Sequence, residues 1–199
     1  MTRSRTLLAS AALLASALVA TEAGAGPLSI VNTNFPAVNC VFHTTCVIVV
    51  TDSVGNFTPP GDSGVARLQS RTSPGIAPAP AGGKMAYIYR VDLTSVSGLT
   101  AANCVTKLEV LFGPVAKEPY SPGALFDVFV GTAGGLGSVG LASASQSGSL
   151  ITFTFASPVC PGATSFFFGL TSASTHPVTS VARLYYSLGG TANTADRVP

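Results

Sequence analysis

Short runs in which apolar side chains alternate with other residues recur along this sequence. The clearest run covers residues 85–93, where Met85, Tyr87, Tyr89, Val91 and Leu93 occupy every second position. In a β-strand such positions lie on one face, so the run offers an apolar face to a core. After residue 25 no long window has the period of an amphipathic helix. The pattern therefore predicts an all-β fold.

Other candidate strands have the same character. They are rich in Val, Ile, Phe, Tyr and Thr, and turn residues separate them about every 8 to 15 positions. Two packed antiparallel sheets would bury these faces, so we predict a jelly-roll or immunoglobulin-like β-sandwich, with a closed barrel as the alternative. The sequence has no Trp, so the buried Trp of a true immunoglobulin core is absent. The further candidate strands are residues 47–50, 65–70, 107–112, 126–130, 150–155, 165–170 and 178–188.

The N-terminal segment is typical of a cleavable export signal. Arg3 and Arg5 precede an uncharged run over residues 6–20, and the small residues Ala23-Gly24-Ala25 follow. We predict cleavage after Ala25, with Ala23 as the second choice, rather than an N-terminal helix of the mature fold. The run is too short for a bilayer span, which takes about 20 apolar residues. Residues 1–25 are therefore left out of the predicted fold.

The compartment expected for the mature chain is extracellular, with the periplasm or the cell surface as alternatives. A lipid anchor would need a Cys directly after the apolar run, whereas the first is Cys40. Charged residues, Pro or Gly interrupt every later apolar stretch, so we expect no transmembrane anchor in the mature form.

Charge limits the classes of partner. The chain has 10 Lys and Arg against 8 Asp and Glu; removing Arg3, Arg5 and Glu22 with the signal leaves 8 and 7. No basic stripe exists for a phosphate backbone, so we predict no nucleic-acid partner. Charged residues make up only 9% of the chain, which favours self-association or binding to a cell-surface partner.

Four cysteines in an exported chain indicate two disulfides, for which three pairings exist. We favour Cys40–Cys46, which would close a tight hairpin, and Cys104–Cys160, whose members lie at the edges of candidate strands. The alternative is a metal site, but the Cys-x₅-Cys spacing of the first pair does not match the usual zinc-ligand spacing.

We expect one domain over residues 26–199. The Pro-rich segment 72–83 is interpreted as a long surface loop rather than an interdomain linker, and the Gly-rich segment 131–140 as a second loop. The polar tail after Gly190 is expected to fray.

Two short motifs resemble catalytic or cofactor-binding ones. Gly61-Asp62-Ser63-Gly64 resembles the nucleophile segment of chymotrypsin-like proteases, but His43 stands only 20 residues from Ser63 in the sequence, and the family needs a Ser, a His and a buried carboxylate from two barrels. We interpret the motif as a turn. Residues 135–140 match the dinucleotide-binding glycine pattern but lack the following helix and acidic residue.

Side chains for hydrolysis or metal binding are few. His43 and His176 cannot form a three-histidine metal site. Asp92, Glu109 and Asp127 lie in or beside candidate strands and would support a hydrolase only if they met in one pocket. A surface ion pair of Glu109 with Lys107 is the simpler role. We predict no catalytic residue, no cofactor and no metal. Residues 52–56 are interpreted as a turn rather than as a metal-binding loop.

Tyrosines could bind sugars. Tyr185 and Tyr186 are the candidates for ligand binding, because adjacent residues of a strand point to opposite faces and one of the two could be exposed. The run Phe166-Phe167-Phe168 predicts either burial on both faces of a strand or an apolar patch for a partner.

The order of features over residues 85–170 resembles exported bacterial β-sandwich proteins of uncharacterised function. It runs through Tyr87-x-Tyr89-x-Val91, a strand ending near Phe112, residues 126–129, Phe153-x-Phe155 and residues 161–165. Similar runs occur in proteins with a C-terminal sorting helix; this chain ends in residues 195–199 without one, so such anchoring is not expected. The resemblance implies a bacterial exported protein and brings no catalytic residues with it.

Three functions agree with these features. We expect a non-catalytic secreted or cell-surface protein with a structural or adhesive role. The alternatives are an extracellular glycan-binding module, favoured if Tyr185 or Tyr186 lies exposed beside a groove, and a hydrolase.

Overall fold

The computed structural model of this chain describes residues 25–35, 37–47, 51–97, 103–133 and 136–199. It is all-β: sixteen strands and one 3₁₀ helix account for its regular structure, and these ranges contain no α-helix. The predicted signal segment before Ala25 and most of the candidate strand 47–50 lie outside the described residues. The elements are β1 (Gly26–Leu28), β2 (Ile30–Thr33), η1 (Val38–Val41), β3 (Thr51–Phe57), β4 (Ser63–Gly64), β5 (Ala66–Pro74), β6 (Met85–Asp92), β7 (Val96–Ser97), β8 (Val105–Leu111), β9 (Glu118–Ser121), β10 (Ala124–Phe126), β11 (Val128–Gly131), β12 (Leu141–Ser147), β13 (Leu150–Val159), β14 (Phe167–Ser172), β15 (Val178–Tyr186) and β16 (Thr191–Val198).

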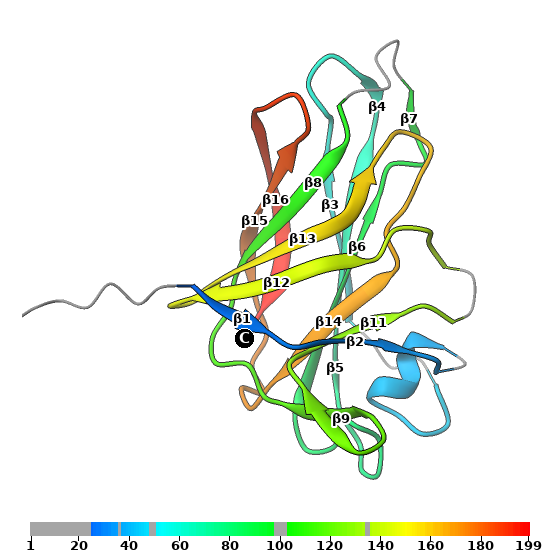
Figure 1. Cartoon of the computed structure of the whole chain (residues 1–199), viewed down its shortest axis with the longest axis vertical. Coiled ribbons are helices and arrows are strands. Elements are labelled where there is room, and N and C mark those ends of the chain that lie inside the picture. The colour runs from blue at the N-terminus through cyan, green and yellow to red at the C-terminus, as the bar shows by residue number, and fades with distance from the viewer. Residues whose placement is uncertain (1–24, 36, 48–50, 98–102, 134–135) are drawn as a thin grey trace, which may run out of the picture.

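Two six-stranded sheets dominate the structure (Figure 1). Sheet A has the order β1-β12-β13-β8-β15-β16, and sheet B the order β2-β11-β14-β6-β5-β3. All pairings in them are antiparallel except β2 with β11. The pairs β9–β10 and β4–β7 form two small additional sheets. This arrangement is consistent with a β-sandwich.

The main core is built from the alternating residues of both sheets. Met85, Tyr87, Tyr89, Val91 and Leu93 all belong to it, as their period-two spacing predicts. Aromatic rings fill its centre, with ring centroids 5.0 Å apart for Phe153 and Phe168 and 6.1 Å apart for Tyr89 and Phe168. Sheet A contributes the matching residues Leu108, Val110, Ile151, Phe153 and Phe155, and Phe112 follows directly after β8.

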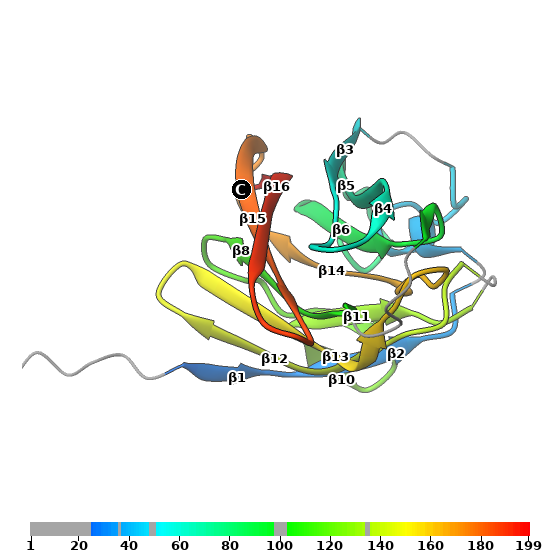
Figure 2. The ribbon, with the colours of Figure 1, turned by 90° about the horizontal axis from the view of Figure 1, so that it is seen from above.

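The two sheets also contact each other along their edge strands. Sheet A curves so that β16 reaches β3 and β5 of sheet B (Figure 2). The Tyr89 hydroxyl donates to the Arg197 carbonyl at 2.7 Å, and the Arg197 amide donates to the Ser70 hydroxyl at 2.8 Å. On the opposite side, β1 pairs with β12 of sheet A and β2 with β11 of sheet B, so that the chain passes from one sheet to the other at Ser29.

A second apolar cluster covers the outer face of sheet B. Phe42, the residue directly after η1, packs there with Ile88, Phe129 and Phe167. Phe168 faces the main core instead, so the phenylalanine run is buried on both faces of β14. The guanidinium groups of Arg71 and Arg90 lie over the Phe167 ring, at 4.7 and 5.0 Å from its centroid.

The predicted surface loop 72–83 belongs to this covering layer, which corrects its interpretation. β5 continues through Pro74, and the following turn docks on η1: the Ala81 amide donates to the Val41 carbonyl at 2.9 Å, and the Ile76 amide to the Phe42 carbonyl at 2.8 Å. Ala81 is fully buried in the second cluster. The outer face of sheet A, in contrast, exposes large apolar side chains such as Leu111 and Val181.

Two further predictions were wrong. The tail after Gly190 does not fray, because Thr191–Val198 forms β16 and pairs with β15 along its whole length. Residues 52–56 form part of the strand β3 rather than a turn.

Both predicted disulfides are present. One joins Cys40, within η1, to Cys46, and the other joins Cys104, just before β8, to Cys160, just after β13. Because β8 and β13 are neighbours in sheet A, the second disulfide fastens two central strands at one end. Among the described residues, no helix has the length and apolar character needed to cross a membrane.

Candidate functional site

Strand register brings a row of polar side chains together on the exposed face of sheet A. Glu109 of β8 lies opposite Thr152 of β13 and opposite Arg183 of β15, and Arg183 lies opposite Asn193 of β16. Neighbouring strands are about 4.8 Å apart, so these side chains form a continuous polar row across four strands.

An apolar row runs beside the polar one, two positions along each strand. Leu111 lies opposite Leu150, and Val181 lies opposite Ala195. Leu111 and Val181 are 51% and 58% exposed, and with Leu150 they form an apolar row on this face. Between the two rows lies a cavity of about 410 Å³, which we call the sheet A groove; it is lined by Glu109, Leu111, Leu150, Val181, Arg183 and Asn193.

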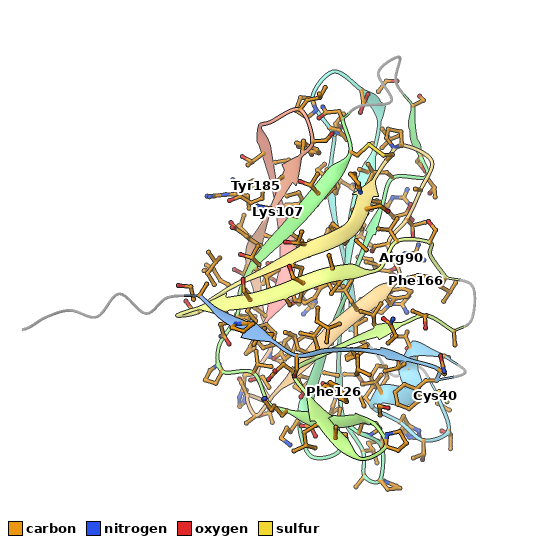
Figure 3. All side chains as sticks on the ribbon, in the orientation of Figure 1. Cys40, Arg90, Lys107, Phe126, Phe166 and Tyr185 are labelled. Atoms are coloured by element: carbon orange, nitrogen blue, oxygen red, sulfur yellow. A yellow bond between two sulfur atoms is a disulfide. The ribbon has the colours of Figure 1, made fainter. Side chains whose placement is uncertain are left out.

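The carboxylate of Glu109 is held in place on both oxygens. The Tyr185 hydroxyl donates to Oε2 at 2.7 Å, and the Thr152 hydroxyl donates to Oε1 at 3.4 Å. Tyr185 is half-buried on the outer face, opposite Lys107 in the neighbouring strand (Figure 3). The carboxylate is thus oriented before any ligand arrives.

Tyr186 points to the inner face of sheet A, opposite to Tyr185. It is 4% exposed and belongs to the main core. Burial, with a smaller contribution from the negative charge of Asp62, raises the pKa of Tyr186 to about 12. Tyr186 is therefore removed from the candidate ligand-binding residues, and of the pair only Tyr185 contacts a residue that lines the groove, Glu109.

Positive charge prevails on the outer face of sheet A. Its six strands contain five charged residues, Lys107, Glu109, Arg183, Asp196 and Arg197, and Asp196 is fully buried on the inner side. The outer face therefore carries three cations and one anion. Within the part of the chain that is described, neither Lys107 nor Arg183 makes an ion pair.

The ion pair of Lys107 with Glu109, expected from the sequence, is absent from the described structure. Glu109 uses its oxygens for Tyr185 and Thr152 instead. The reason is geometric: the two hydroxyl groups come from the neighbouring strands and lie beside the carboxylate, whereas Lys107 extends into solvent.

The three carboxylates considered for hydrolysis do not share a pocket. Asp92 accepts hydrogen bonds from Thr94 and Arg90; burial alone would raise its pKa, but these bonds and the Arg90 charge lower the pKa overall. Asp127 accepts hydrogen bonds from Ser29. Of the three, only Glu109 lines the sheet A groove.

The protease-like motif has no catalytic geometry. Ser63 forms the small strand β4 with Gly64, and its hydroxyl donates to the Ser97 carbonyl at 2.8 Å. The ring of His43 is engaged by the Thr45 hydroxyl at 2.6 Å, and no bond connects it to Ser63 in the described structure. The last two residues of the protease-like motif therefore form a short strand, next to the turn that the sequence predicts.

No helix follows the glycine pattern of residues 135–140 in the described structure. Gly135 lies outside the described residues, and Leu141–Ser147 after the motif is the strand β12. Without a helix N-terminus the pattern offers no pyrophosphate site. The described residues also contain no group of three or more His, Cys, Asp or Glu side chains that could hold a metal ion.

Comparison of this chain with models of protein families, with curated proteins and with solved structures gave no match. Resemblance to exported bacterial β-sandwich proteins therefore stays a prediction.

Proposed function

We propose that this protein is exported and acts outside the cytoplasm as a non-catalytic β-sandwich with a structural or adhesive role. The predicted export signal and the two disulfides support the compartment, because disulfides persist in oxidising surroundings. A rigid body held by two sheets and two covalent links suits a protein that bears load or carries a binding face.

For the sandwich we infer the jelly-roll or immunoglobulin-like type. Successive long strands change sheet repeatedly, from β6 to β8, from β8 to β11, from β11 to β12, from β13 to β14 and from β14 to β15. Such crossings support Greek-key connections, which both types contain.

The separation of the carboxylates carries the non-catalytic part of the proposal. Asp92 and Asp127 are engaged by hydrogen bonds of their own, and Glu109 stands without a second acid in the groove. Glycoside hydrolysis with paired carboxylates needs the two groups about 5 to 10 Å apart on either side of the bond to be cleaved. The groove suits binding without such chemistry.

A second candidate function, glycan binding, is favoured by one observation. Tyr185 donates a hydrogen bond to Glu109 and so fixes the carboxylate that lines the sheet A groove. A sugar ring has an apolar face and a polar edge of hydroxyl groups, and the groove presents an apolar row beside a polar row. Aliphatic or aromatic surface combined with a few fixed polar groups is typical of small-ligand sites.

The test of the proposed compartment is the intact mass of the secreted protein before and after reduction, followed by peptide mapping. We expect an N-terminus at Gly26 and a mass that rises on reduction by the hydrogens of two disulfides. An uncleaved N-terminus or four free thiols would overturn the exported role.

Glycan binding is tested by screening the mature protein against immobilised saccharides beside a Tyr185→Ala variant. Binding that the variant loses supports the second candidate. Arg67→Gln, an exposed change on β5 of sheet B, is the control and should bind as the wild type does.

A further inference from the structure

The charge of the groove indicates which saccharides it would bind. Arg183 stands in the centre of the polar row, between Glu109 and Asn193. Its neighbour Glu109 is occupied by the Tyr185 and Thr152 hydroxyl groups, and Arg183 has no partner of its own among the described residues. A planar guanidinium with free donors is suited to bidentate binding of a carboxylate.

We propose that the sheet A groove binds a saccharide that carries a carboxylate, such as a uronic acid, and that Arg183 binds this carboxylate. The inference rests on the glycan-binding candidate above and adds the class of sugar. Lys107, exposed on the same face and two positions from Glu109, raises the local positive charge, which favours an anionic over a neutral ligand.

The apolar row argues for a sugar ring rather than for a small anion alone. Leu111, Leu150 and Val181 line one side of the cavity, and an inorganic anion would leave that surface in water. A pyranose ring can cover it with its C–H face while its carboxylate and hydroxyl groups reach the polar row. The cavity volume of about 410 Å³ lies within the range of small-ligand sites and leaves room for a short saccharide.

Glu109 and Asn193 complete the recognition on either side of Arg183. The Glu109 carboxylate is an acceptor with fixed orientation, and the Asn193 amide both donates and accepts. Sugar hydroxyl groups flank the carboxylate of a uronic acid and could bond to both. Because the ligand's carboxylate binds at Arg183, the Glu109 charge meets neutral hydroxyl groups rather than a second anion.

The experiment compares two ligands that share the same sugar chain and differ in the charge of the carboxyl group, which the ester replaces with a neutral methyl ester. Short oligomers of galacturonic acid and their methyl esters are titrated calorimetrically into the mature, disulfide-bonded protein at about 0.15 M salt, where long-range attraction between exposed charges is largely screened. We expect the acid to bind about tenfold tighter than the ester, the effect of one charge-assisted pair. Arg183→Gln should bring the acid to the affinity of the ester, whereas Arg67→Gln on sheet B should change neither.

The possible contrary results distinguish an error in the class of sugar, in the role of Arg183 and in glycan binding itself. If acid and ester bind equally and Leu111→Asp abolishes both, the groove binds glycans but the acidic class is overturned. If Arg67→Gln weakens the acid as much as Arg183→Gln does, the attraction is non-specific and the role of Arg183 is overturned. If neither oligomer binds and the saccharide screen is also negative, the glycan-binding candidate fails with it. Unchanged thermal unfolding of the variants shows that they fold.

Discussion

Ser29 and Asp127, 98 residues apart, are joined by hydrogen bonds in both directions. The Ser29 amide and hydroxyl donate to the Asp127 carboxylate at 2.8 and 2.7 Å, and the Asp127 amide donates to the Ser29 hydroxyl at 3.0 Å. Ser29 is the residue at which the chain leaves sheet A for sheet B. The pair thus fixes the place where one segment joins both sheets.

Replacing Asp127 with Ala should therefore weaken the fold. The carboxylate is buried, so its loss leaves the Ser29 donors without their acceptor, and we expect the free energy of unfolding to fall by about 3 kcal/mol. Urea unfolding followed by circular dichroism measures this change. Asp52→Ala is the control: its carboxylate, 41% exposed, pairs with Arg71 at the surface, and the expected loss is under about 1 kcal/mol. Equal losses in the two variants would contradict a special role for the Ser29 pair.

The buried carboxyl of Asp196 should make stability depend on pH. Asp196 is fully buried, and this burial raises its pKa to about 7, with its own amide group lowering it slightly. In the unfolded chain the pKa is about 3.9. The folded protein therefore keeps a proton that the unfolded chain has lost between these values, so the Asp196 contribution is largest below about pH 4 and is lost as pH rises toward 7.

Asp196→Asn removes this titration. Relative to the wild type, the variant should gain stability between pH 4.5 and pH 8, by a few kcal/mol, because each unit of pKa shift corresponds to about 1.4 kcal/mol. Urea unfolding of both proteins at several pH values gives the difference. The comparison uses the change with pH rather than the absolute stability, since the buried amide has a cost of its own. A difference that stays constant from pH 4.5 to pH 8 would rule out the proposed titration.

The two disulfides should differ in their contribution to stability. Cys104 and Cys160 are separated by 56 residues and Cys40 and Cys46 by 6, and the entropy that a cross-link removes from the unfolded chain grows with loop length. Replacing Cys104 and Cys160 with Ser should lower the free energy of unfolding by about 4 kcal/mol. Replacing Cys40 and Cys46 with Ser should lower it by about 2 kcal/mol. Denaturant unfolding of the two double variants checks the order. A larger loss for the short loop would show that strain or local packing outweighs chain entropy.

Much of sheet B and of the core could be read from alternation alone. Tyr87 and Tyr89 are buried on the face that their spacing indicates. The strand β16 was missed because its inward positions include Thr194 and Asp196, which look like a solvated tail in the sequence. Propensity and pattern could not show that pairing with β15 and contact with sheet B would bury these polar residues.

The groove could not be predicted for a different reason. Glu109 and Arg183 are 74 positions apart in the numbering, and only the register of β8 against β15 makes them neighbours. A single sequence gives the face on which a strand residue lies but not its partner in the next strand. Tyr185 was named as a candidate because its type suggested sugar binding, and this role stays a prediction, whereas Arg183 and Asn193 carried no signal before the register was known.

The hydroxyl groups of the adjacent tyrosines provide a final, matched test. Tyr185→Phe removes the donor that orients Glu109, so we expect binding of the galacturonic acid oligomer to weaken about tenfold with little change in stability. Tyr186→Phe removes a buried hydroxyl that has no hydrogen-bond partner in the described structure, so it should leave binding unchanged and raise the free energy of unfolding by about 1 kcal/mol. Calorimetric titration and urea unfolding of both variants separate the two effects. If Tyr186→Phe weakened binding as much as Tyr185→Phe, the ligand would not be bound on the outer face of sheet A, because only Tyr185 reaches it.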